Sequence, residues 1–160
     1  FNDVAISILR LREMGMERFL IVDVDPHFGD GTRNFFGGDP NVYHINFNHQ
    51  QSSNFDGELN NYDIGIGFDA DDEQFLRELG SAMEMAKDFD FEICFVVFGH
   101  DSHADDYGGF ELTIAAYPKM ARIIKEAVGD RGIVFVLSGG SVPEVASKAI
   151  PEVIAVLAGR

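Results

Sequence analysis

The 160-residue chain has one cysteine, no tryptophan and only 12 Lys and Arg against 27 Asp and Glu. Cys94 cannot form an internal disulfide, and because it lies in an apolar run we expect a reduced core thiol and a cytoplasmic protein. The formal net charge of −15 argues against a nucleic-acid partner, since phosphate binding relies on basic side chains. No apolar run approaches the roughly 20 residues of a membrane span, so no membrane partner is expected.

The composition is that of a protein with a buried core, because 46% of the residues are hydrophobic. We expect residues 1–160 to form a single domain. Many acidic residues fall between Phe55 and Glu92, either as a solvated face or as a field that attracts cationic partners. The chain opens on Phe1 inside an expected helix, which predicts a processed chain or, more simply, a piece of a longer protein: a partial domain without its N-terminal part.

Apolar runs alternate with amphipathic segments along the chain. The expected strands are Phe19–Val24, Val42–Phe47, Ile93–Phe98 and Ile133–Leu137. The expected helices begin near Asn2 and stop at Gly15, run from Asp71 to Phe89 and from Thr113 to Val128, and close the chain as a pair from Pro143 to Ala158. Residues 48–61 are polar and are expected to form a long loop.

This alternation predicts a three-layer α/β fold, a parallel sheet flanked by helices. The strands are apolar throughout, as strands covered on both faces must be. Ligands of such sheets collect at the carboxyl ends of the strands. The residues that follow each strand are therefore the candidates for a functional site.

The stretch FLIVDVDPHFGDG places Asp23, Asp25 and His27 at alternate positions where the first strand ends. Side chains along an extended chain alternate between faces, so these three are expected to point the same way. Carboxylates buried without a cation would cost several kcal/mol each. Two of the three could close on one metal ion while the third supports them; the alternative is that they only cap loops and the next helix.

The next strand end, FGHDSHADDYGG, places Asp101 where it could join Asp25 and His27. Such an Asp-His-Asp set leaves coordination positions open, as metal catalysis requires. One imidazole and two carboxylates suit zinc, iron, cobalt or manganese. After the last strand, LSGGS carries Gly139 and Gly140, which either let the backbone approach a substrate or only form a turn.

Together these motifs resemble the histone deacetylase and acetylpolyamine amidohydrolase superfamily. FNDVAISILRL, VDVDPHFGDG, GHDSHADDYGGFELT and VLSGGS occur in that family's order and spacing. The resemblance covers essentially the whole chain but only the later part of a family domain. It implies an arginase/deacetylase-type fold around an eight-stranded parallel sheet.

The resemblance also implies site residues. Zinc ligands fall on Asp25, His27 and Asp101, and Asp23 falls on the position that supports a catalytic histidine and helps to bind potassium. The backbone around the two metal ligands of the first strand end would complete the potassium shell, together with that of residues 46 and 47. Gly139 and Gly140 fall on the substrate-binding turn.

Two departures from the family pattern bear on catalysis. The paired catalytic histidines of the family lie upstream of the segment matching FNDVAIS and are expected outside this chain. Ser141 stands where the family has the tyrosine that stabilises the oxyanion, so the catalytic positions present here are Asp23 and Ser141. Tyr107, in the loop of Asp101, is a conceivable substitute.

The first functional hypothesis is a zinc-dependent amidohydrolase that removes acetyl groups from acetyl-lysine or acetylated polyamines. A second is a member without catalysis that keeps the metal and binds acylated ligands. A third is a two-manganese ureohydrolase of the arginase type, because DSHAD (residues 101–105) matches a D-x-H-x-D metal signature.

Overall fold

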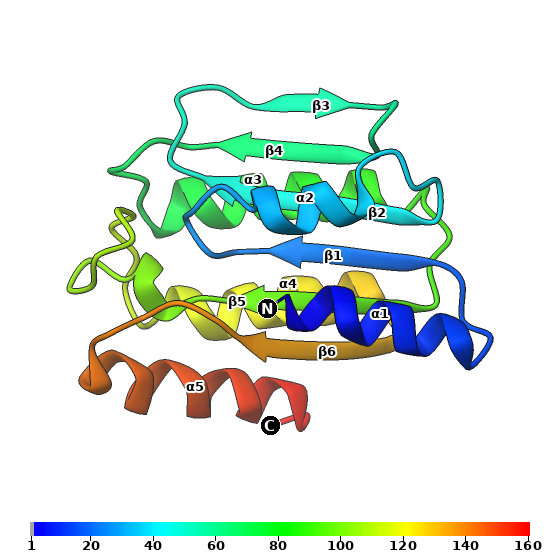
Figure 1. The fold of residues 1–160 in the computed structure, drawn as a ribbon. Helices are drawn as coiled ribbons and strands as arrows, with labels where there is room; N and C mark the ends of the chain where they lie inside the picture. The colour runs from blue at the N-terminus through cyan, green and yellow to red at the C-terminus, as the bar shows by residue number, and fades with distance from the viewer. Residues whose placement is uncertain (1) are drawn as a thin grey trace.

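The computed structural model describes residues 2–160 as a six-stranded sheet with helices on both faces (Figure 1). The strands are β1 (Phe19–Asp23), β2 (Val42–Asn48), β3 (Asn54–Asp56), β4 (Asn61–Gly65), β5 (Ile93–Phe98) and β6 (Gly132–Leu137). The helices are α1 (Asp3–Glu13), α2 (Asp30–Phe36), α3 (Asp72–Ala86), α4 (Ala116–Val128), α5 (Pro143–Leu157) and a short 3-10 turn η1 (His100–Ser102).

The strand order is β3-β4-β2-β1-β5-β6, and every neighbouring pair is parallel except β3 with β4. β1 lies between β2 and β5, with Asp23 level with Asn46 on one side and Val97 on the other. The carboxyl ends of β1, β5 and β6 therefore meet at one edge. The predicted three-layer α/β fold is confirmed, with an antiparallel edge strand added.

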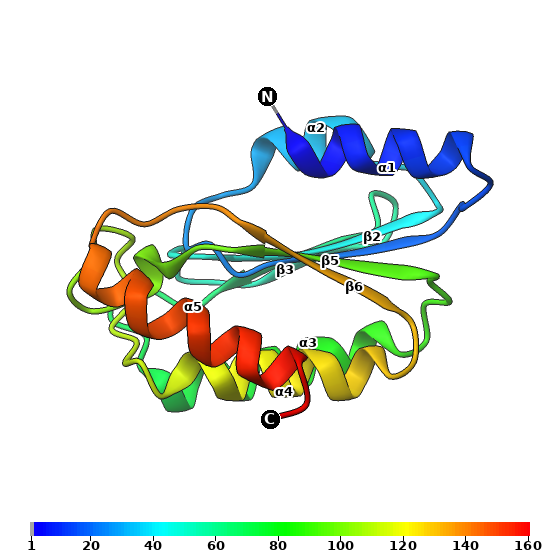
Figure 2. The same ribbon diagram turned by 90° about the horizontal axis from the view of Figure 1, so that it is seen from below.

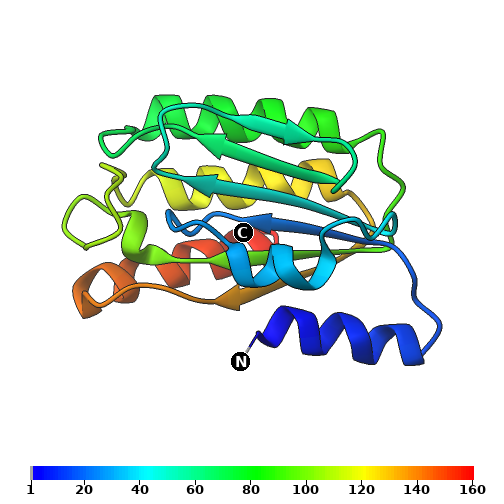
Figure 3. The same cartoon turned by 45° about the horizontal axis from the view of Figure 1, so that its top comes forward.

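The two faces of the sheet are covered differently. α1 and α2 lie on one face, and α3, α4 and α5 lie on the other (Figures 2 and 3). Alternate residues of the strands divide between these faces, as the pleat requires. Tyr43, Ile45 and Phe47 of β2 join the large core under α3, α4 and α5, whereas the intervening His44 and Asn46 face α1 and α2.

Local signals in the sequence set several boundaries as expected. The Asn2 side chain accepts a hydrogen bond from the Ala5 N–H (2.8 Å) and caps α1, and Gly15 follows that helix with a φ of +94°. Asp71 caps α3 in the same way through the Gln74 N–H (2.9 Å). Cys94 is fully buried, as predicted.

The last strand differs from the expectation that it is covered on both faces. β6 is a sheet edge among the described residues, and none of its six residues is fully buried. Leu137 is 61% exposed. An apolar run thus indicated a strand here without fixing how much of it is covered.

The closing helix pair was also a wrong prediction, because α5 is one continuous helix. Pro151 lies inside it on the solvent-exposed side. Proline removes one N–H from a helix, and on the outer side the freed carbonyl can be hydrated. Pro143 occupies the first turn of α5, as expected.

Three smaller features escaped the sequence. The expected long loop contains β3, which pairs antiparallel with β4 at the sheet edge. β4 itself was not predicted as a strand. α2 follows the Asp-x-His segment directly and was not predicted.

Candidate metal centre

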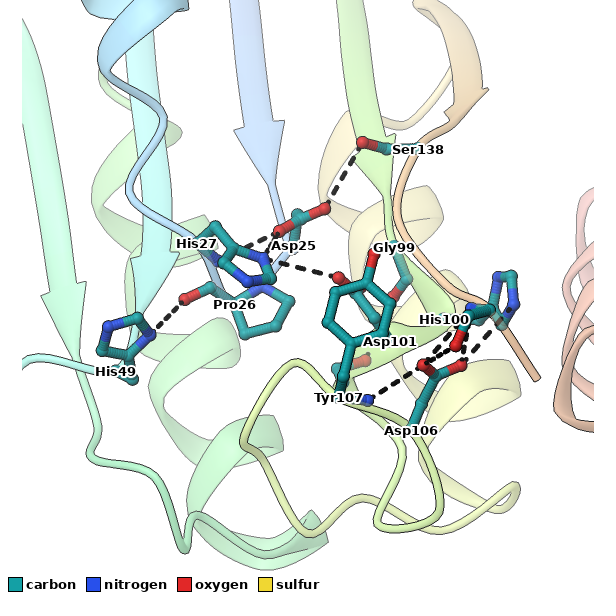
Figure 4. Close-up of polar contacts among 12 residues, drawn as sticks. Asp25, Pro26, His27, His49, Gly99, His100, Asp101, Asp106, Tyr107 and Ser138 are labelled. Carbon is teal, nitrogen blue, oxygen red and sulfur yellow. Dashed lines mark hydrogen bonds and ion pairs between the residues drawn. The ribbon is translucent and has the colours of Figure 1, made fainter.

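Asp25, His27 and Asp101 come together at the carboxyl ends of β1 and β5 (Figure 4). One ligand atom from each lies within 4.8 Å of the others. The Nδ1 atom of His27 is 2.8 Å from Asp25 Oδ1 and 3.4 Å from Asp101 Oδ2. The three residues predicted as metal ligands therefore face one point, and within residues 2–160 no other group of three His, Cys, Asp or Glu has this geometry.

The local backbone produces this convergence differently from the predicted alternation. β1 ends at Asp23, and its last ladder bond joins the Val24 N–H to the Val97 carbonyl (3.0 Å). Asp25 and His27 lie in the loop that follows, where the Asp25 carboxylate accepts the His27 N–H (3.0 Å). This turn brings the His27 imidazole back over the Asp25 carboxylate. Asp23 is consequently separate from the cluster.

Asp101 is the residue of the cluster that most needs a cation or a hydrogen-bond donor. It is fully buried, and neither carboxylate oxygen has a hydrogen-bond partner among the described residues. The pKa of Asp101 is raised to about 6, first by burial and then by the Asp25 carboxylate, while His27 acts in the opposite direction. Buried carboxylates without partners are costly unless a cation or donor satisfies them. These three residues thus fit a divalent cation.

Two glycines leave the space around the carboxylates open. A Cβ atom at Gly139 would lie 2.7 Å from Asp25 Oδ2 and closer still to the Asp101 carboxylate, and one at Gly99 would crowd the same two groups. The backbone of two loops can therefore approach the cluster only because these positions lack side chains. The Ser138 hydroxyl lies 3.4 Å from Asp25 Oδ2 and holds that carboxylate from the β6 side.

Asp23 occupies a neighbouring compartment. It is 5% exposed, and its carboxylate accepts the Asp25 N–H (3.2 Å). Burial, followed by the Asp25 charge, raises the pKa of Asp23 well above its usual range. Together with Asn2, Thr32 and Ser138 it lines a cavity of about 270 Å³ between the first helices and the ends of β5 and β6.

Ser141 does not face the cluster. Its hydroxyl donates to Asp106 Oδ1 (2.9 Å), and its N–H and that of Val142 donate to the same carboxylate (3.0 Å each to Oδ2). Burial alone would raise the pKa of Asp106, but the Val142 and Ser141 N–H groups outweigh it and lower the pKa. Asp106 therefore ties the loop of Asp101 to the glycine turn before α5. A Cβ at Gly140 would collide with the His100 ring.

The residues of the D-x-H-x-D signature (residues 101–105), which would form a two-metal site, do not come together in the structure. His103 is 8% exposed and stacks on Tyr117, with ring centroids 6.4 Å apart. Its Nδ1 accepts the Asp105 N–H (3.0 Å), and the Asp105 side chain is 80% exposed. The three residues of the D-x-H-x-D signature thus point to different surroundings, and only Asp101 belongs to the cluster.

One backbone group of the predicted potassium shell is hydrogen-bonded to a side chain of the protein. The His27 carbonyl accepts a bond from Asn46 Nδ2 (3.3 Å), and Asn46 Oδ1 accepts the Gly29 N–H (3.3 Å). Asn46 is fully buried. The potassium ion stays a prediction.

Sequence reasoning did not assign two residues that the site depends on. Asp106 connects two loops through four donor groups, those of Tyr107, Ser141 (two) and Val142. Gly99 was not assigned either, although it lies only two residues before Asp101. A glycine close to a buried acid was the signal available, because close packing of a carboxylate excludes side chains.

Comparison with known proteins places these residues in a family. A family model described as the histone deacetylase domain matches residues 1–157. Histone deacetylase 9 of Homo sapiens is 27% identical over 88% of this chain and 16% of its own length. Histone deacetylase 14, chloroplastic, of Arabidopsis thaliana is 30% identical over 100% of this chain and 42% of its own length.

Solved structures agree. A histone deacetylase homologue from Aquifex aeolicus superposes with a TM-score of 0.87 at 26% identity, and a homologue complexed with SAHA superposes with 0.89 at 25%. Each match covers 100% of this chain and 46% of the other. An acetylpolyamine aminohydrolase from Burkholderia pseudomallei, 19% identical with a TM-score of 0.83, shares the fold. The chain spans half or less of the length of each of these relatives.

Proposed function

Because this chain belongs to the histone deacetylase family, we propose that the protein is a metal-dependent amidohydrolase that removes acetyl groups from acetyl-lysine or acetylated polyamines. The observation that carries the proposal is the meeting of Asp25, His27 and Asp101, with both Asp101 oxygens buried and unpartnered. The relatives supply the reaction class, since they include deacetylases and an acetylpolyamine aminohydrolase. No helix among residues 2–160 is long and apolar enough to cross a membrane.

We assign the metal to Asp25, His27 and Asp101, with zinc as the first choice and iron, cobalt or manganese as alternatives. When bound there, a divalent ion supplies Lewis acidity, which lowers the pKa of a coordinated water and polarises a carbonyl. The residues present are suited to hold it. Asp101 offers oxygens with no competing donor, and Ser138 orients Asp25 from outside.

A general base for the water is not available among the five histidines of the chain. His44 is buried against Asn61, and burial lowers its pKa to about 4. His49 bonds to the Pro26 carbonyl (3.2 Å) and stacks on Phe68. His100 and His103 lie against Asp106 and Tyr117, and His27 is a proposed ligand. We therefore propose that residues 1–160 are part of a longer domain whose upstream segment supplies the histidine pair.

The cavity beside Asp23 supports this view. The Asp23 carboxylate, which is buried and has a raised pKa, lines this cavity next to the cluster. A histidine placed in the cavity would find there a hydrogen-bond acceptor for its ring N–H. We assign Asp23 the role of orienting that histidine. In the same scheme Gly139 and Gly140 form the turn along which the substrate's acyl group lies.

The test uses the full-length protein loaded with zinc and a matched pair of variants from one loop. Asp101→Asn removes a charge from the cluster, whereas Asp105→Asn removes one from a side chain that is 80% exposed. We expect the first to lower zinc occupancy and to slow acetyl-lysine or acetylpolyamine hydrolysis by at least about 100-fold, and the second to leave both intact. Unchanged hydrolysis by Asp101→Asn would exclude this mechanism.

The same preparation separates the alternatives. A protein that binds acetyl-lysine peptide without ever releasing acetate is the binding member without catalysis, a reading that the Ser141 position motivates. About two manganese ions per chain would favour the arginase-type enzyme. One ion per chain with acetate release supports the deacetylase.

A further inference from the structure

Hydrolysis of an amide needs a hydrogen-bond donor aimed at the carbonyl oxygen as that oxygen gains negative charge. Two hydroxyl groups beside the cluster are already engaged. The Ser141 hydroxyl donates to Asp106 (2.9 Å), and the Ser138 hydroxyl donates to Asp25 (3.4 Å). A donor that is free for a substrate must come from another side chain.

Tyr107 carries such a donor. Its ring centroid lies 5.9 Å from that of His27 with the planes tilted by 45°, and its hydroxyl has no hydrogen-bond partner among residues 2–160. Figure 4 shows the ring rising from the loop so that the hydroxyl end points toward the side where Asp25, Gly99 and Asp101 gather. The residue is 61% exposed, so a substrate entering the site from solvent can reach it.

The backbone on both sides of Tyr107 is anchored to the metal centre. The Tyr107 N–H donates to Asp106 Oδ1 (2.9 Å), and the Gly108 N–H donates to the carbonyl of Asp101 (2.9 Å). A side chain at Gly108 would collide with that carbonyl and with the ring of Pro26. Gly109, with a φ of +92°, continues the turn against Phe68. Tyr107 is thus held at a fixed place relative to a proposed ligand.

We propose that Tyr107 is a catalytic residue whose hydroxyl donates a hydrogen bond to the acyl carbonyl oxygen as negative charge develops on it. No covalent bond forms to the tyrosine, and its proton stays on the phenol oxygen. This inference rests on the proposed amidohydrolase function. It explains how a chain with Ser141 bound to Asp106 can still stabilise the oxyanion: the donor lies one residue along from the carboxylate that holds that serine.

The test compares Tyr107→Phe with Tyr62→Phe in the full-length, zinc-loaded protein. Tyr62 lies in β4 and packs on Phe55, away from the centre, so its variant controls for the loss of a phenol oxygen. We expect Tyr107→Phe to lower kcat by about 100-fold, with KM and zinc affinity little changed, because a donor used in the transition state is lost. Tyr62→Phe should retain kcat.

A second readout does not depend on turnover. SAHA carries a hydroxamate whose carbonyl oxygen can accept the same donor, and calorimetry measures its affinity. We expect Tyr107→Phe to weaken SAHA binding by up to about 10-fold, in line with one hydrogen bond, with no change for Tyr62→Phe.

The two proposals fail in different ways. An active wild-type protein whose Tyr107→Phe variant keeps full kcat and SAHA affinity overturns the role of Tyr107 alone. A kcat loss that accompanies lost zinc binding also overturns it, because the residue would then only support the loop. A wild-type protein that never releases acetate overturns the proposed function, and equal SAHA affinities in that protein would overturn the placement of Tyr107 too.

Discussion

The two faces of the sheet differ in the polarity of the side chains that they bury. The face under α3, α4 and α5 carries apolar side chains of β1, β2, β4, β5 and β6, and these form one large core. The other face, which α1 and α2 cover (Figure 2), has a small apolar cluster and a row of buried polar side chains. That row consists of Asp23, His44, Asn46, Asn48, Asn61 and Asp63. The comparison indicates that stability comes mainly from the first face, whereas the second face holds buried polar groups, among them Asp23 beside the proposed metal centre.

The largest expected effect on stability comes from a substitution on the apolar face. Phe47 is fully buried, with its ring centroid 4.9 Å from that of Phe75, so Phe47→Ala should lower the free energy of unfolding by about 3–5 kcal/mol. Phe35 of α2, 61% exposed, offers the matched control, and Phe35→Ala should cost less than about 1 kcal/mol. Urea denaturation measures both. Equal losses would mean that burial of the Phe47 ring in the apolar core is not the source of its contribution.

Metal addition should have the next largest effect, and it acts at the strand ends. Zinc at about 100 times its dissociation constant should stabilise the folded protein by roughly 3 kcal/mol, because the ion binds the folded state only. The gain should be larger at pH 7 than at pH 5, since the pKa of Asp101 is about 6 and the metal needs the carboxylate. Thermal unfolding with and without a chelator tests this.

The variants Asp101→Asn and Asp105→Asn serve as the pair for that measurement. The first should abolish the zinc-dependent gain, and the second should preserve it, because the Asp105 side chain lies outside the cluster. If the zinc-dependent gain in stability persists in Asp101→Asn, the metal does not bind at this residue.

The smallest expected effect is the pH dependence of stability that buried His44 contributes on the polar face. His44 is fully surrounded by protein, and burial lowers its pKa from 6.5 to about 4. Between these values the unfolded chain binds a proton that the folded protein does not, so this residue's contribution to stability falls as the pH falls from about 6.5 to 4. The expected loss is about 2 kcal/mol between pH 7.5 and pH 5.

His44→Gln should remove that part of the pH dependence, read as the difference between the two unfolding curves. His49→Gln is the control, because His49 lies near the site and is not fully buried. If both variants keep the wild-type slope, another group on the polar face titrates instead.

Much of this could be read from the sequence because the signals are local. The helix starts near Asn2 and Asp71 and the four apolar strands each depend on a few neighbouring residues, and the structure has them where they were predicted. The expected alternation of Asp23, Asp25 and His27 along one strand did not hold, because β1 ends at Asp23. The covering of β6 was not predictable in the same way. An apolar run such as Ile133–Leu137 fits a strand buried on both faces or an edge strand equally well, since burial depends on which elements lie beside it.

The sequence by itself determined the alternation of strands and helices and the three residues that gather at the strand ends. Those are matters of periodicity and of residue chemistry. Only the tertiary structure decided that β1 stops at Asp23, that Ser141 turns to Asp106, and that Tyr107 stands beside His27. These outcomes depend on contacts between loops about 35 to 80 residues apart in the chain, and the energy of such contacts exists only once the strands have brought the loops together.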